Sequence, residues 1–107
     1  MVVTFPVWPV YDKDEQEAVL QVLQTGRGNY WSGEFGKQFE DSFATWCGAK
    51  HGLCVSNGTV AIEIALKSLG ISAGDEVIVP ARSFLASAAS VVAVNAKPVF
   101  ADIEIGT

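Results

Sequence analysis

The hydrophobic positions near the start of the chain repeat with the period of an amphipathic helix. One face carries an apolar stripe that stops before Gly26 and consists of Ala18, Val19, Val22 and Leu23. Asp12 and Glu15 stand three residues apart, which is the spacing of a capping box at the start of a helix. The pattern therefore predicts a first helix that begins after Asp12 and ends before Gly26.

A second apolar stripe is aromatic. Phe35, Phe39 and Phe43 recur every four residues, and Trp46 continues the same face ahead of Gly48. The spacing predicts a second helix that Gly48 caps. Because such stripes are typical of core packing, we expect these rings to be buried rather than to form a cofactor site.

The second half of the chain alternates between short apolar runs and helical periods. Gly52–Val55 predicts a buried strand, and the turn 56–59 leads into a helix that Gly70 ends. Val77–Val79, apolar throughout, predicts a strand buried on both faces. A helix over 83–96 and a strand over 97–101 follow. The helix between the turn 56–59 and Gly70 is expected to bury Ala61, Ile62, Ala65, Leu66 and Leu69.

This order of elements favours an α/β fold with a mainly parallel sheet, because helical crossovers join parallel strands economically. In open sheets of this kind, ligands bind beyond the carboxyl ends of the strands. Three such ends are expected to converge: Ser56–Thr59, Pro80–Phe84 and Asp102–Glu104. The first would contribute an anion site, the second a basic and an aromatic side chain, and the third carboxylates.

The turn Ser56-Asn57-Gly58-Thr59 has two interpretations. As an anion cradle, it would offer the free N–H groups and positive dipole end of a helix, an open approach at Gly58 and the Thr59 hydroxyl. As a plain strand-to-helix turn, it would need only Asn57 or Ser56 as an N-cap. The loop from Thr25 to Gly33, rich in glycine and aromatic residues, is similarly open to a functional or a merely connecting role.

Composition narrows the class of protein. The 107 residues suit one domain, and half of them are hydrophobic. A net charge of −5 disfavours nucleic-acid and anionic-membrane partners. Cys47 and Cys54 form neither a disulfide framework nor a metal-spaced pair, and no metal site is predicted. The start of the chain lacks the pattern of a signal peptide and no run reaches membrane-spanning length, so we expect a cytoplasmic protein.

Several separated motifs resemble the DegT/DnrJ/EryC1/StrS family, the sugar aminotransferases among the fold-type-I enzymes that depend on pyridoxal phosphate (PLP). The motifs follow in the family's order and spacing from about Trp8 to Glu104. They are the Trp-Ser-Gly-x-x-Gly-x-x-Phe-Glu run at 31–40, Val-Ser-Asn-Gly-Thr-x-Ala at 55–61, Gly-Asp-Glu-Val-Ile-Val-Pro at 74–80, Ser83-Phe84 and Lys-Pro-Val-Phe-Ala-Asp at 97–102.

The resemblance implies roles for particular residues. Gly58, Thr59 and the main-chain N–H of Val60 would hold the phosphate of PLP, and Phe84 would stack on its pyridine ring. The loop residues Asn29, Tyr30 and Trp31 would lie on the substrate side of the site or toward a partner subunit. It also implies a homodimer that takes an amino group from glutamate or glutamine and passes it to a nucleotide-linked keto sugar or a keto cyclitol.

The resemblance covers only the N-terminal portion of the family. We expect residues 1–50 to form an arm and two helices, and 51–107 to begin the three-layer α/β/α large domain of the aspartate aminotransferase type. No lysine here is assigned as catalytic, because the Schiff-base lysine is expected beyond residue 107 and Lys97 starts its strand at the wrong end. The unfinished sheet suggests a cut, so the segment alone should be inactive.

Two other readings compete with that of an aminotransferase segment. One is a non-enzymatic α/β module that binds a phosphate-bearing ligand or a partner protein. The other is a dinucleotide-binding domain, which is disfavoured because the G-x-G-x-x-G fingerprint is missing between its first strand and helix.

Overall fold

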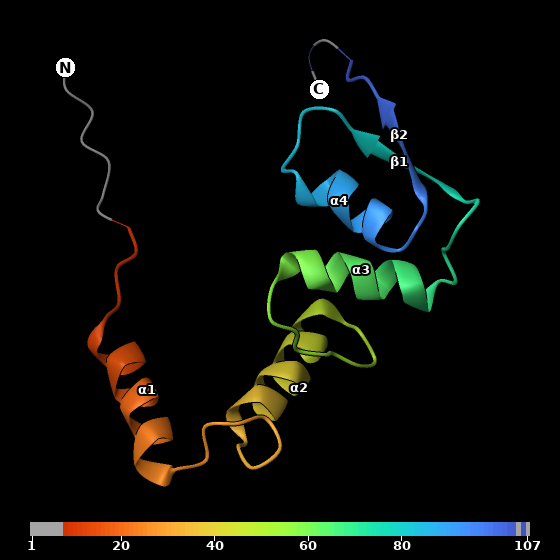
Figure 1. Cartoon of the computed structure of the whole chain (residues 1–107). Coiled ribbons are helices and arrows are strands. Elements are labelled where there is room, and N and C mark those ends of the chain that lie inside the picture. Colours follow the sequence, from red (N-terminus) through yellow and green to blue (C-terminus); the bar gives the residue numbers. More distant parts are fainter. Residues whose placement is uncertain (1–7, 105, 107) are drawn as a thin grey trace, which may run out of the picture. The chain divides into compact units, whose positions relative to one another are not determined.

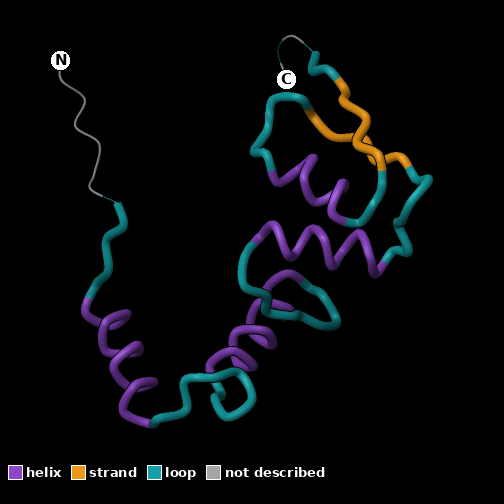
Figure 2. Tube along the Cα trace, in the orientation of Figure 1, coloured by secondary structure: helices purple, strands orange, loops and turns teal. Residues whose placement is uncertain are grey.

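The computed structural model describes residues 8–104 and 106. The chain divides into two compact units, Met1–Cys54 and Val55–Thr107, and each is described by itself. Figure 1 shows their elements in chain order and Figure 2 shows the same trace by secondary structure. The predicted N-terminal arm falls largely outside the described residues.

The first unit contains two helices, α1 (Lys13–Thr25) and α2 (Phe35–Cys47), as the periodicity predicts. The capping box is confirmed, because the Asp12 N–H donates to Glu15 Oε2 at 2.7 Å. Gly26 and Gly48 follow the two helices with φ of 65° and 67°, in the left-handed region that glycine tolerates best. The sequence therefore located both helices and their ends.

The expectation that the aromatic stripe of α2 is buried is wrong for the described residues. Trp46 is 80% exposed, the three phenylalanines are about half exposed, and Ala44 is the buried residue of this helix. The rings instead cover one another: Phe39 stacks on Phe43 at 5.6 Å between ring centroids, and Phe43 lies 5.5 Å from Trp46. The reason is that, within the described part of this unit, no other helix or strand packs against α2.

The second unit contains α3 (Gly58–Ser68), β1 (Glu76–Pro80), α4 (Ala86–Ala93) and β2 (Lys97–Ala101). The two strands pair in parallel, from Glu76 opposite Lys97 to Pro80 opposite Ala101. α4 connects them and packs on both strands and on α3 (Figure 1). The α/β class and the parallel pairing through a helical crossover are thus confirmed.

The core of the second unit lies between α4 and the sheet. It consists of Val79, Val91, Val94 and Ala96, with Leu66 of α3 among the partly buried residues packed against it.

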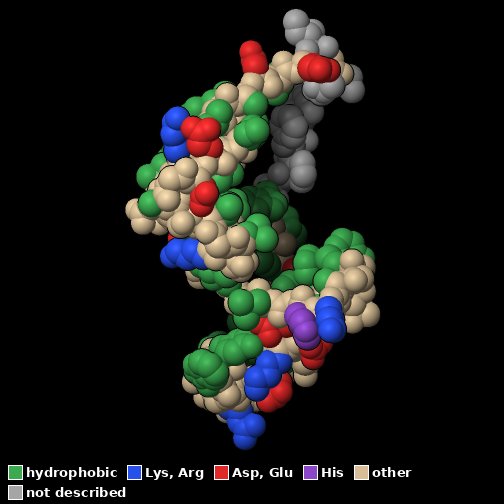
Figure 3. All heavy atoms as spheres, turned by 90° about the vertical axis from the view of Figure 1, so that its right-hand side faces the viewer, with side chains coloured by type: hydrophobic (Ala, Val, Ile, Leu, Met, Phe, Trp, Pro, Cys, Tyr) green, Lys and Arg blue, Asp and Glu red, His purple; other side chains and the backbone are tan. Residues whose placement is uncertain are grey.

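Two burial expectations were wrong. β1 is buried on one face only, because Ile78 is 74% exposed where Val79 is buried. On α3, Leu66 packs on the core but Ala61, Ile62, Ala65 and Leu69 are exposed. No other described residue of this unit buries these four side chains. Figure 3 shows that hydrophobic side chains also lie at the surface elsewhere along the chain.

Two further predictions need correction. Gly52–Val55 is not a strand, since a strand needs a hydrogen-bonded neighbour and β1 pairs only with β2 in the described sheet. The helix predicted from Ser83 begins at Ala86 instead. Ser83 Oγ bonds Ser87 Oγ at 2.7 Å rather than capping the helix backbone. Of the helices described, none combines the length and apolar character that crossing a membrane requires.

Candidate functional site

A hollow of about 390 Å³ lies at the start of α3, within the second unit. It brings the turn Asn57-Gly58-Thr59 together with Phe84, which follows β1. Two of the three segments expected to converge, the turn 56–59 and the end of β1, therefore do so. Sequence reasoning did not anticipate the remaining lining residues, Ile62, Ala86 and Ser87.

The first turn of α3 presents hydrogen-bond donors at this hollow. Asn57 is the N-cap, as one interpretation of the turn predicted, and its Oδ1 accepts the N–H of Val60 at 3.0 Å. The N–H groups of Gly58 and Thr59 precede the first intrahelical donor, Ala61, which bonds the Asn57 carbonyl. A Cβ built on Gly58 would meet no atom within 4 Å, so the approach to this turn is open.

Ser90 of α4 ties this turn to the core. Its side chain is fully buried, and its hydroxyl donates to the Thr59 carbonyl oxygen at 3.3 Å. Phe84 lies just before α4. The hydrogen bond from Ser90 to Thr59 therefore holds the start of α3 and the Phe84 segment, which line the hollow from two sides, relative to each other. No local pattern predicts this contact, since its partners are 31 residues apart in the sequence.

Phe84 is well exposed and lines two hollows. It lines the one at α3, and it also lines a second hollow of about 300 Å³ together with Phe100 and Leu85. Its neighbour Ser83 is bonded to Ser87, which lines both hollows as well. An exposed ring beside a helix start can stack on a flat ligand whose anionic group reaches the N–H donors.

The third strand end and the charged residues stay outside this hollow. Asp102 directly follows β2, and its Oδ1 accepts the N–H of Ile103 at 2.8 Å. Arg82 does not line the hollow. Lys97 pairs with Glu76 at 2.7 Å at the amino ends of both strands, and this bond raises the pKa of Lys97. Lys97 therefore stands at the amino end of β2, where the sequence placed it.

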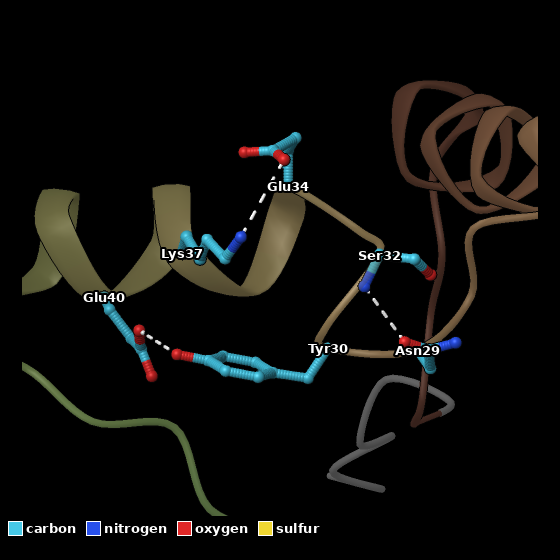
Figure 4. Close-up of polar contacts among 6 residues, drawn as sticks. All are labelled: Asn29, Tyr30, Ser32, Glu34, Lys37 and Glu40. Atoms are coloured by element: carbon cyan, nitrogen blue, oxygen red, sulfur yellow. Dashed lines mark hydrogen bonds and ion pairs between the residues drawn. The ribbon is translucent and has the colours of Figure 1, made fainter.

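The loop predicted to lie on the substrate side belongs to the first unit. Asn29 and Tyr30 line a hollow of about 240 Å³ with Arg27 and Gly33. Asn29 Oδ1 accepts the N–H of Ser32 at 3.0 Å, as Figure 4 shows.

Within the same loop, Trp31 is exposed and meets Tyr30 edge to face at 5.6 Å between ring centroids. This loop is therefore built by its own contacts rather than being a loose connector.

Tyr30 is anchored on α2. Its phenol donates to Glu40 Oε2 at 3.0 Å (Figure 4), and this bond is the main reason why the pKa of Tyr30 is raised. Glu40 Oε1 also accepts the N–H of Cys54 at 2.6 Å. Glu40 stands in the Trp31–Glu40 motif, yet sequence reasoning gave it no role.

These features define part of an α/β fold with a candidate ligand site beside the carboxyl ends of the parallel strands, where the first turn of α3 and Phe84 line one hollow. The model of the DegT/DnrJ/EryC1/StrS aminotransferase family matches residues 9–107. The chain belongs to this family.

Curated relatives carry names of aminotransferases and related synthases. L-glutamine:2-deoxy-scyllo-inosose aminotransferase of Streptomyces lividus is 41% identical over 106 residues, which cover 94% of this chain and 25% of that protein. GDP-perosamine synthase of Caulobacter vibrioides is 41% identical over 97 residues, which cover 88% of this chain and 25% of that protein. The chain thus spans about a quarter of the length of these relatives.

Solved structures agree with this assignment. An aminotransferase from Psychrobacter cryohalolentis superposes with a TM-score of 0.90 at 46% identity, over 94% of this chain and 26% of that one. NtdA from Bacillus subtilis, solved with bound cofactor PMP, gives a TM-score of 0.79 at 36% identity, over 97% of this chain and 25% of that one. The fold class predicted from sequence, the N-terminal part of a PLP-dependent transferase, is confirmed.

Proposed function

We propose that this chain is the N-terminal part of a PLP-dependent aminotransferase, which moves an amino group from glutamate or glutamine onto a keto sugar or keto cyclitol. The observation that carries the proposal is the hollow in which the start of α3 meets Phe84, in a chain of this family. The names of the relatives support the substrate classes, since one names glutamine with an inosose and the other an amino sugar linked to GDP.

The residues of the hollow fit a phosphorylated, flat cofactor. Gly58 leaves its turn open, and the N–H groups of the first helical turn with the Thr59 hydroxyl would hold the phosphate. Val60 can contribute its N–H only if Asn57, which now accepts it, turns away. Phe84 would cover one face of the ring. When bound, the cofactor supplies the electron sink for amino-group transfer.

Further parts of the proposal concern the whole protein. We place Asn29, Tyr30 and Trp31 on the substrate side, as the resemblance to the family implies. The loop around them is held by a hydrogen bond and a ring contact of its own, and it lines a hollow. The resemblance to the family supports a homodimer. The two free cysteines favour the cytoplasm, where thiols stay reduced.

The phosphate role is tested by replacing Thr59 in the full-length protein. Thr59→Ala should weaken PLP binding about tenfold or more, because it removes a hydrogen bond to a charged group. Binding is measured by titrating PLP and following its visible absorbance. Thr45→Ala is the matched control, since the Thr45 hydroxyl bonds only the Asp41 carbonyl inside α2.

Unchanged PLP affinity in Thr59→Ala would contradict the phosphate role. A full-length protein without a PLP chromophore that glutamate or glutamine can bleach would overturn the proposed activity itself. The hollow would then hold another phosphate-bearing ligand, as the non-enzymatic reading predicts.

A further inference from the structure

Glu40 is a charged residue of α2 that the proposed function leaves without a role. Its two carboxylate oxygens accept hydrogen bonds from two separate segments of the first unit. Oε2 accepts from the Tyr30 phenol at 3.0 Å (Figure 4), and Oε1 accepts from the N–H of Cys54 at 2.6 Å. One side chain therefore joins the substrate-side loop, α2 and the segment that leads toward the start of α3.

Both segments pack closely on α2, one through the Tyr30 ring and the other through its backbone at Gly52. A Cβ on Gly36 would stand 3.1 Å from the Tyr30 ring, and a Cβ on Gly52 would stand 2.6 Å from the Glu40 carbonyl oxygen. Cys54 adds a contact of 3.7 Å from its Sγ to the Gly36 carbonyl oxygen. The two partners of the carboxylate are thus held in place by packing as well as by hydrogen bonds.

Because Tyr30 is held on α2, the loop residues beside it are positioned as well. Trp31 lies edge to face on its ring, and the Asn29 side chain holds the N–H of Ser32. Hydrogen bonds to an ionised acceptor are stronger than neutral ones, so the Glu40 carboxylate fixes the phenol more firmly than a neutral amide would.

We propose that Glu40 is a positioning residue for the amino acceptor: through Tyr30 it holds the loop Asn29–Trp31 where the keto sugar or cyclitol binds. This inference rests on the proposed function. Glu40 acts on the second substrate through the loop, and no direct contact of its carboxylate with PLP or with the amino donor is needed.

The experiment compares three variants of the full-length enzyme. Glu40→Gln removes the charge, Tyr30→Phe removes only the phenol and leaves the Cys54 bond, and Asp41→Asn removes a neighbouring charge of α2. The acceptor probes are 2-deoxy-scyllo-inosose and a GDP-linked keto sugar, and conversion of the cofactor by glutamine is followed separately by absorbance.

We expect Glu40→Gln and Tyr30→Phe to raise the KM for the acceptor about tenfold, which corresponds to one charge-assisted hydrogen bond. Conversion of the cofactor by glutamine should change less than about twofold, and Asp41→Asn should match the parent enzyme. The double variant of Glu40 and Tyr30 should be no worse than the single variants, because both act through one bond.

The titration of Tyr30 gives a readout that needs no acceptor. The hydrogen bond to Glu40 raises the pKa of Tyr30, because only the neutral phenol can donate it. The bond is therefore fully present below the ordinary tyrosine pKa of about 10. The Tyr30–Glu40 hydrogen bond is lost as the pH rises through the raised pKa of Tyr30. In Glu40→Gln the pKa should fall toward the ordinary value, as measured by ultraviolet titration against the matching Tyr30→Phe protein.

Each outcome supports or overturns the inference. An unchanged Tyr30 pKa in Glu40→Gln shows that the tie is not formed. An acceptor KM equal to that of Asp41→Asn, or an equal loss in the glutamine half-reaction, shows that Glu40 does not position the acceptor loop. If glutamine converts the cofactor of the parent enzyme but neither acceptor probe is turned over, the proposed acceptor class is contradicted instead. The titration of Tyr30 then still shows whether its hydrogen bond to Glu40 is formed.

Discussion

At the scale of single residues, the candidate site depends on side chains that bond across long stretches of sequence. Ser90 is an example, because its buried hydroxyl reaches the Thr59 carbonyl and so links α4 to the turn at the start of α3. Because Ser90 is buried, this hydrogen bond should contribute to stability, since a buried polar group without a partner costs free energy.

Ser90→Ala should therefore lower the free energy of unfolding by about 1 kcal/mol. Ser68→Ala is the matched control, because Ser68 is exposed and bonds the carbonyl of Ala65 within its own helix. Its effect should lie within about 0.5 kcal/mol. Urea unfolding of the full-length protein measures both, and equal effects of the two substitutions would show that the tie to Thr59 contributes nothing.

At the scale of elements, the fold depends on how closely extended segments approach helices. Gly52 belongs to the segment that fails to form the expected strand, and it lies directly on the backbone of α2 at Glu40. A side chain there would displace backbone rather than a flexible side chain. The segment is therefore positioned by close packing instead of by a strand ladder.

Gly52→Ala should destabilise the protein by about 1–3 kcal/mol, the range for overpacking at a tight contact. A Cβ on Gly28 would meet no atom within 4 Å, so Gly28→Ala is the control and should change the stability by less than about 0.5 kcal/mol. Thermal unfolding followed by circular dichroism compares them. An equally stable Gly52→Ala protein would contradict the close approach.

At the scale of the whole molecule, apolar surface is left uncovered in both units. Trp46 and the phenylalanines of α2 are exposed in the first unit, and Ile78 and Leu69 are exposed in the second. Exposed apolar patches of this kind mark surfaces that other protein segments cover. The chain also matches only about a quarter of the length of its relatives.

The isolated 107-residue chain should consequently associate or be poorly soluble, and it should show no aminotransferase activity. Light scattering after size-exclusion chromatography measures the first property, and bleaching of the PLP absorbance by glutamine measures the second. A well-behaved monomer with a sharp thermal transition would contradict this expectation. The intact mass of the native gene product is the further test: a value well above that of 107 residues would identify the chain as one piece of a longer enzyme.

Local features of the sequence were sufficient to place most of the elements. The capping box at Asp12, the left-handed positions at Gly26 and Gly48, and the apolar runs of β1 and β2 all depend on neighbours within a few residues. The family motifs likewise identified the class of protein, because their order is written along the chain. These properties follow from backbone conformation and side-chain pattern alone.

Burial and the bonds of the site were decided only by the tertiary structure. The aromatic stripe of α2 predicts a buried face, but a stripe cannot show whether a partner element covers it. The bonds from Ser90 to Thr59 and from Glu40 to Tyr30 and Cys54 join residues between 10 and 31 positions apart. Such contacts depend on where the chain returns in space, and no local period of the sequence encodes that position.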